Sequence, residues 1–182
     1  MKKGEIYEGR VQEVLFPDKA IVVTDEGETA QVKYGIPGQK LRFRVKKKRK
    51  EKIEGILLEI LEKSADETAC LCEWAGKCGG CLYQTLPYEK QLAIKEAQIK
   101  KMLDNGGTDY TFEGIVSSPV VSGYRNKVEL TFGDSYMGGP LALGMHQRGS
   151  FYDIVSVSDC QIVDEDYRKI LVMTQEHFKD CS

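Results

Sequence analysis

Four cysteines have the residue type and the spacing to hold a metal centre. Cys72, Cys78 and Cys81 stand together in one short segment, and Cys160 lies far downstream. Three thiolates from one loop and one from a distant segment can surround a single centre. The Gly79-Gly80 pair allows the backbone to curl closely around it. We therefore predict that these four thiols bind a metal ion or an iron–sulfur cluster.

Disulfides and zinc are the alternatives for the same cysteines. The N-terminus lacks the apolar core of a signal peptide and no long apolar run follows it, so we expect a cytoplasmic protein whose thiols stay reduced. A zinc site of four cysteines usually has two C-x2-4-C pairs, whereas this chain has one C-x2-C pair, one cysteine six positions earlier and one distant cysteine. The spacing favours a cluster and leaves zinc open.

Two cysteines, Cys70 and Cys181, lie outside the predicted ligand set. Cys70 lies two residues before Cys72, and residues two apart on an extended segment share a face, so geometry does not exclude Cys70 as a ligand. The spacing favours Cys72. Cys181 is the penultimate residue, where chain ends fray, and we expect it to be incidental.

The first 62 residues carry a basic row. They hold 14 Lys and Arg against 11 Asp and Glu, or +3, although the whole chain has a net charge of −2. Between 40 and 46 basic and apolar residues alternate, so a strand there places Leu41, Phe43 and Val45 inward and a cationic row outward. The members of that row are Lys40, Arg42, Arg44 and Lys46. A solvated hairpin end is the alternative, but the ordered row favours phosphate binding.

Short strands separated by turn residues surround that row. They are expected at 5–14, 20–24, 29–33, 40–46 and 53–62. Five such strands predict a small closed barrel of the OB type, a fold that binds oligonucleotides along one face. Tyr7 and Tyr34 are either base-stacking residues or ordinary barrel residues.

Beyond the barrel we predict a smaller α+β domain. A helix is expected at 87–105, with a core stripe formed by Tyr88, Leu92, Ile99, Met102 and Leu103. Strands at 124–132, 141–148 and 151–157 then return the chain to Cys160, and a helix follows at 164–179. The predicted fold is therefore α+β, with an OB-like five-stranded barrel at 1–62 and an antiparallel sheet plus helix domain at 63–182. We expect this second domain to be incomplete at its C-terminal end.

Together these residues resemble the RNA uracil-5-methyltransferase family, whose cluster-bearing branch places an N-terminal TRAM barrel before a [4Fe–4S] domain. The resemblance covers almost the whole chain, and the cysteine pattern is its most specific part. The matching stretches are the basic strand, the cysteine loop followed by Gln84, Tyr124–Lys127, Leu143–Gly149 and Ser158–Cys160.

The resemblance implies that the four cysteines and the methyl-transfer chemistry belong to different domains. The four matched cysteines would hold a [4Fe–4S] cluster that is structural or helps RNA binding. A following domain would bind S-adenosylmethionine and methylate C5 of a uridine through a reactive cysteine. This chain shows no strand, glycine loop and helix for that cofactor. We therefore expect no catalytic or cofactor-binding residue here, and no activity of the chain alone.

The resemblance also implies RNA contacts and partners. Arg42, Arg44 and Lys46 are the first candidates, and Arg125, Lys127 and Arg148 are weaker ones. The expected partner is RNA, with 23S rRNA favoured over tRNA, and we expect a monomer with no membrane or DNA partner. One alternative is a stand-alone RNA-binding module stabilised by zinc or a cluster, without enzymatic activity. Electron transfer is disfavoured, because no flavin or nicotinamide site is seen.

Overall fold

The chain forms two compact units in the computed structural model, which describes residues 1–50 and 52–179. The first unit combines Met1–Thr68 with Leu86–Val116, and the second combines Ala69–Thr85 with the residues from Ser117 onward. Cys181 lies outside the described residues. The domains expected at 1–62 and 63–182 differ from these units, because the segment 86–116 belongs with the barrel residues.

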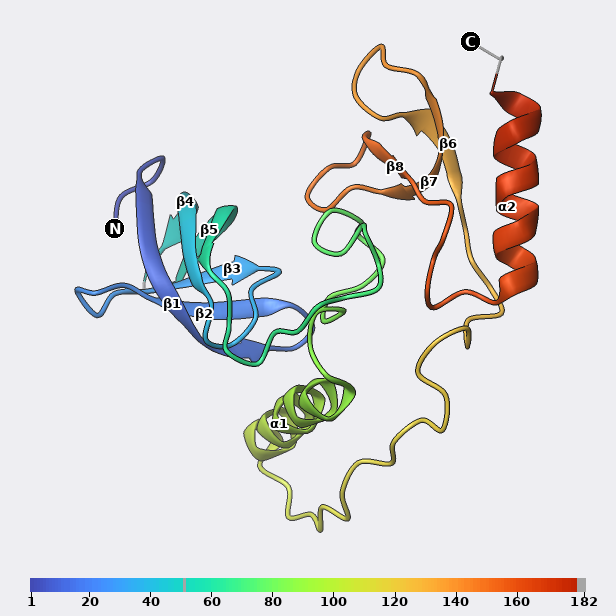
Figure 1. The fold of residues 1–182 in the computed structure, drawn as a ribbon. Helices are drawn as coiled ribbons and strands as arrows, with labels where there is room; N and C mark the ends of the chain where they lie inside the picture. Colours follow the sequence, from blue (N-terminus) through green and yellow to red (C-terminus); the bar gives the residue numbers. More distant parts are fainter. Residues whose placement is uncertain (51, 180–182) are drawn as a thin grey trace. The chain divides into compact units, whose positions relative to one another are not determined.

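The first unit is built on five strands that pair in the circular order β1-β2-β3-β5-β4 and form a closed barrel (Figure 1). They are β1 (Ile6–Leu15), β2 (Lys19–Val23), β3 (Thr29–Lys33), β4 (Lys40–Arg49) and β5 (Lys52–Glu62). All neighbours run antiparallel except β3 and β5, which pair in parallel through Val32 and Gly55. The alternation predicted for β4 is confirmed, since Leu41, Phe43 and Val45 are buried in the barrel core.

Helix α1 (Tyr88–Gly106) belongs to the same unit. Its buried residue is Gln98, whose amide nitrogen donates to the Val14 carbonyl oxygen at 3.1 Å. Ion pairs join Lys90 to Asp66 at 2.8 Å and Lys101 to Glu13 at 2.6 Å. Of the predicted core stripe, Tyr88 and Leu92 are half-buried, but its later part was wrong because the polar anchors turn another helix face toward the strands. Ile99, Met102 and Leu103 are exposed.

The second unit contains an antiparallel sheet of order β6-β7-β8 with helix α2 beside it, in orange and red in Figure 1. The elements are β6 (Thr131–Asp134), β7 (Leu141–His146), β8 (Ile154–Ser156) and α2 (Glu165–Phe178). Asp164 caps α2 by accepting from the Asp166 backbone nitrogen at 2.9 Å. Gln175 ties α2 to the sheet, since its amide donates to the Leu143 carbonyl oxygen at 2.8 Å.

The strand predicted at 124–132 is found only from Thr131 onward. Upstream, the Arg125 amide donates to the Ile162 carbonyl oxygen at 2.9 Å and Arg125 forms one isolated bridge with Val163. Apart from this bridge, residues 124–130 pair with no strand in the described part of the chain. The α+β prediction is confirmed by the five-stranded and three-stranded sheets with two helices. Neither described helix is long and apolar enough to cross a membrane.

Candidate functional site

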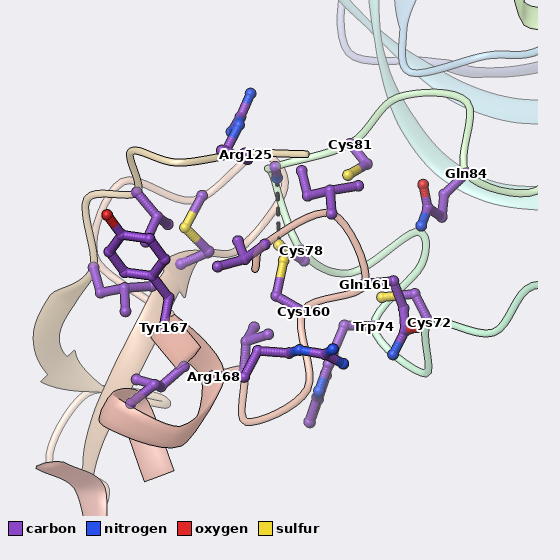
Figure 2. A pocket seen from close by; sticks show the side chains of 18 of the residues that line it. Cys72, Trp74, Cys78, Cys81, Gln84, Arg125, Cys160, Gln161, Tyr167 and Arg168 are labelled. Atoms are coloured by element: carbon purple, nitrogen blue, oxygen red, sulfur yellow. Dashed lines mark hydrogen bonds between the residues drawn. The ribbon is translucent and has the colours of Figure 1, made fainter. Parts of the chain in front are cut away.

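All four predicted ligand cysteines line one cavity in the second unit (Figure 2). Cys72, Cys78 and Cys81 come from the loop before α1, and Cys160 comes from the segment after β8. Cys70 is not among the described residues that line this cavity, and every described cysteine is a free thiol. The described His, Cys, Asp and Glu side chains include no group of three arranged to hold one metal ion.

The cysteine loop is held against the end of β7. The Gly79 amide donates to the His146 carbonyl oxygen at 2.9 Å, and Cys78 pairs with Gln147 in an isolated bridge. A Cβ atom on Gly79 would lie 2.9 Å from the same His146 oxygen, which belongs to the backbone and has little room to move. A glycine is therefore required at this point of close approach.

Arg148 fixes the same loop from the other side. Its Nε donates to the Cys78 carbonyl oxygen at 3.3 Å, and its Nη2 donates to the carbonyl oxygens of Cys81 and Leu82. Its backbone amide also donates to the Lys77 carbonyl oxygen at 2.7 Å. We predicted Arg148 as an RNA contact, but the structure places its guanidinium on the loop that carries three of the cysteines. The residue organises that loop.

The cavity disfavours free thiolates. Burial, followed by the nearby charges of Cys160, Cys78 and Cys72, raises the pKa of the Cys81 thiol to about 11. Burial is also the main cause that raises the pKa of Cys72. Metal binding requires thiolates, so a cation that enters this cavity displaces protons from the thiols.

Two nitrogen donors in the cavity wall have no hydrogen-bond partner. Trp74 Nε1 and Arg168 Nε are both buried without an acceptor in the described part of the chain, although Arg168 Nη1 donates to Asp159 at 2.7 Å. Figure 2 shows both side chains close to the cysteines. Buried N–H groups are normally paired. These two fit a group with acceptor sulfurs, such as a thiolate-bound cluster, which they would reach from its outer side.

Sequence reasoning missed Trp74 and Arg168. The sequence could have indicated that Trp74 lines the cavity, because Trp74 lies between Cys72 and Cys78. Arg168 had none, since only the packing of α2 brings it to the cavity.

The predicted RNA-binding cations have different environments. Arg42 pairs with Glu8 at 2.8 Å and with Glu59 at 2.7 Å, and its hydrogen bond lowers the pKa of Glu8. Arg44 and Lys46 are exposed on β4, and no described carboxylate forms an ion pair with either. Among the described residues, no carboxylate neutralises the charge of either cation of this β4 pair.

The remaining two candidates lie in the second unit. Arg125 lines the cysteine cavity, where its charge partly offsets the rise in the pKa of Cys81 that is caused mainly by burial. Lys127 is highly exposed and pairs with Glu129 at 3.1 Å. The structure therefore brings Arg125 to the cysteines and leaves Lys127 on the surface, and the RNA contacts of both stay predictions.

Several bacterial proteins resemble the chain over nearly its full length. A protein of Clostridium tetani named an uncharacterized RNA methyltransferase is 43% identical over 99% of this chain and 40% of its own length. A protein of the same description from Caldanaerobacter subterraneus is 45% identical, covering 96% of this chain and 38% of its own length. One from Clostridium acetobutylicum is 41% identical, covering 98% and 39%. No protein-family model matches the chain.

A solved structure shares the fold. It is the Pyrococcus abyssi tRNA (uracil-54, C5)-methyltransferase in complex with S-adenosyl-L-homocysteine, with a TM-score of 0.61 and 20% sequence identity. The match covers 96% of this chain and 37% of that one. The chain thus spans about 40% of the length of the curated relatives that it matches.

Proposed function

We propose that the chain is the RNA-recognition portion of an S-adenosylmethionine-dependent RNA uracil-5-methyltransferase, since it is 41–45% identical over nearly its full length to proteins named RNA methyltransferases. In this proposal the chain binds RNA, and methyl transfer to C5 of a uridine belongs to the part of the relatives that it does not cover. The observation that carries it is that one chain contains both a barrel with cations that no described carboxylate neutralises and a cavity lined by four cysteines.

The barrel supports RNA binding. Its circular order β1-β2-β3-β5-β4 is consistent with the OB type to which the TRAM barrel belongs. Arg44 and Lys46 stand on β4 with no ion pair to a described carboxylate, so their charges are available to phosphates. The neutralised guanidinium of Arg42 makes it a weaker contact than its position suggests.

The cysteine cavity supports a [4Fe–4S] cluster held by Cys72, Cys78, Cys81 and Cys160. The cluster would supply a rigid covalent link between the loop and the segment after β8. The two unpaired donors, Trp74 Nε1 and Arg168 Nε, fit the acceptor sulfurs of such a group. Anaerobic purification followed by iron and sulfide analysis tests this assignment. A protein that contains one zinc ion and no sulfide would contradict the cluster and support the zinc alternative.

Salt-dependent RNA binding tests the proposed function. Neutralising phosphates releases counterions, so the logarithm of the binding constant should fall linearly with the logarithm of salt concentration. Replacing Arg44 and Lys46 by alanine should reduce that slope by about 1 for each phosphate that the variant no longer neutralises. The measurement is fluorescence anisotropy with labelled RNA over a salt series.

A charge-matched control separates specific phosphate binding from net charge. Lys19→Ala with Lys95→Ala removes the same two charges from exposed positions on β2 and α1. The slope should stay near that of the unchanged chain. Binding that is indifferent to salt, or an equal weakening in both double variants, would contradict the assignment to β4.

The identity of the RNA stays a prediction. The solved neighbour is named for a tRNA substrate, and the relatives' names specify no RNA. We propose 23S rRNA as the partner of the parent enzyme, acting in the cytoplasm. Competition between ribosomal and transfer RNA transcripts for this chain distinguishes the two.

A further inference from the structure

Three aromatic rings gather on the connection between β7 and β8. The Phe151 ring stacks on the His146 ring, with centroids 5.9 Å apart and planes 22° apart. The Tyr152 ring meets Phe151 edge-on, with centroids 5.4 Å apart. Phe151 is 79% exposed and Tyr152 is 83% exposed. We name His146, Phe151 and Tyr152 the aromatic turn. A cluster of apolar ring faces open to solvent indicates a binding surface.

The backbone of the aromatic turn is held by its own hydrogen bonds. Gly149 supplies a positive φ of 75°, and the Ser150 amide donates to the Gln147 carbonyl oxygen at 3.1 Å. Ser150 Oγ accepts from the amides of Tyr152 and Asp153, at 3.3 and 3.1 Å. The rings are therefore presented on an ordered segment, which lowers the entropy cost of binding.

The backbone of Lys77 is bonded to Arg148, which lies between His146 and Phe151 of the turn. The Arg148 amide donates to the Lys77 carbonyl oxygen, which places the cysteine loop next to the turn. The Lys77 side chain is exposed and forms no ion pair with a described carboxylate. A flat aromatic surface on a segment that is bonded to a loop with an exposed lysine suits a nucleotide, which combines a π face with a phosphate.

We propose that the aromatic turn stacks an unpaired RNA base and that Lys77 contacts an adjacent phosphate. The proposal rests on the proposed function and names a site for it outside the barrel. Stacking on aromatic rings is tolerant of sequence because every base has a π face, so the turn would hold single-stranded RNA without selecting a base. A base inside a duplex is stacked on both faces and offers no such surface.

Binding of the 182-residue chain to labelled oligouridine and to a labelled RNA duplex tests the site. Phe151→Ala with Tyr152→Ala should weaken oligouridine binding by roughly 5- to 100-fold, the range for losing one stacked base. The salt slope should not change, because stacking releases no counterions. Lys77→Ala should instead reduce the slope by about 1. Duplex binding should be equal in the double variant and the unchanged chain.

Two controls make the result specific. Tyr136→Ala removes a ring that is 63% exposed on the connection between β6 and β7, and it should leave oligouridine binding unchanged. Phe151→Tyr keeps a ring in the turn and should bind like the unchanged chain. Circular dichroism of each variant establishes that the fold is intact.

The possible failures are distinguishable. Salt-dependent oligouridine binding that is equal in the double variant and the unchanged chain overturns the stacking site and leaves the proposed function standing. An equal weakening of oligouridine and duplex binding also overturns it, since the effect would not be one of stacking. If the unchanged chain binds no RNA, the proposed function fails and this inference fails with it.

Discussion

The six basic residues predicted to contact RNA look equivalent in the sequence but have different partners in the structure. Arg42 is neutralised by two carboxylates, Arg148 holds backbone carbonyls, and Arg125 lines the cysteine cavity. Lys127 pairs on the surface, which leaves Arg44 and Lys46 with charges that no described carboxylate neutralises. At the residue scale, the partner of a cation decides its function more than its position in a basic row.

Arg148→Lys tests the structural role of this arginine. A single ammonium group cannot reach three carbonyl oxygens in the geometry of the guanidinium, so we expect the second unit to lose about 1–3 kcal/mol of stability. Hydrogen exchange of amides in 69–85 and chemical denaturation measure the effect.

Lys127→Ala is the matched control for that change. Lys127 is highly exposed and pairs only with Glu129 among the described carboxylates, so its removal should change stability by about 0.5 kcal/mol or less. Unaltered exchange and stability in Arg148→Lys would contradict the role assigned to Arg148.

Trp74→Phe tests the unpaired indole nitrogen. If the cavity holds a cluster, an N–H···S bond stabilises its more negative, reduced state, so removal of the donor should lower the reduction potential. A redox titration followed by electron paramagnetic resonance gives the potential. Tyr167→Phe is the control, because that hydroxyl lines the cavity but donates to the Asn126 carbonyl oxygen. A potential unchanged by Trp74→Phe would show that the indole does not face a sulfur.

At the element scale, local alternation predicted the barrel strands well and the later elements less well. Strands β2, β3 and β4 each alternate buried residues with more exposed ones, so the sequence shows a regular pattern there. The segment 124–132 shows the same alternation, yet only its end has a strand neighbour. An extended backbone and a paired strand look alike in sequence, because the pairing partner lies far away in the chain.

Helix α1 shows a second limit of sequence patterns. Its apolar residues suggested a core stripe, whereas Gln98, Lys90 and Lys101 determine which face meets the barrel. Their partners, Val14, Asp66 and Glu13, are distant in sequence. The four cysteines could be predicted as one site because their chemistry, unlike helix orientation, is specific to residue type.

Gly79→Ala tests how β7 holds the cysteine loop. The new Cβ would lie 2.9 Å from the His146 carbonyl oxygen, so the loop must move away and the Gly79 amide must lose its bond. If the cysteines hold the proposed cluster, we expect a large decrease in its iron, measured by iron and sulfide content after anaerobic purification. Gly106→Ala is the control, because a Cβ at the end of α1 meets nothing within 4 Å. Equal iron content in the two variants would contradict the role of this close approach.

At the scale of the whole molecule, the chain has two cores with different sources of stability. The barrel has a continuous apolar core, whereas the second unit surrounds its cysteine cavity with a small sheet and one helix. If the cysteines hold the proposed centre, its removal should therefore loosen the second unit and leave the barrel unchanged. Hydrogen exchange with and without a chelator should show faster exchange in 69–85 and 117–179 but not in the barrel strands. Faster exchange throughout both units would contradict this division.

The interleaving of the two units has a consequence for synthesis on the ribosome. The first unit is complete when Val116 has emerged, and by then the loop with Cys72, Cys78 and Cys81 has already been translated. Cys160 follows only after the connection at 117–130 and the three strands of the second sheet. We expect the barrel and α1 to fold before Cys160 is available to join the other three cysteines. If the four cysteines hold the proposed centre, one that is delivered to the nascent chain before Cys160 has emerged would have one position open to a foreign ligand.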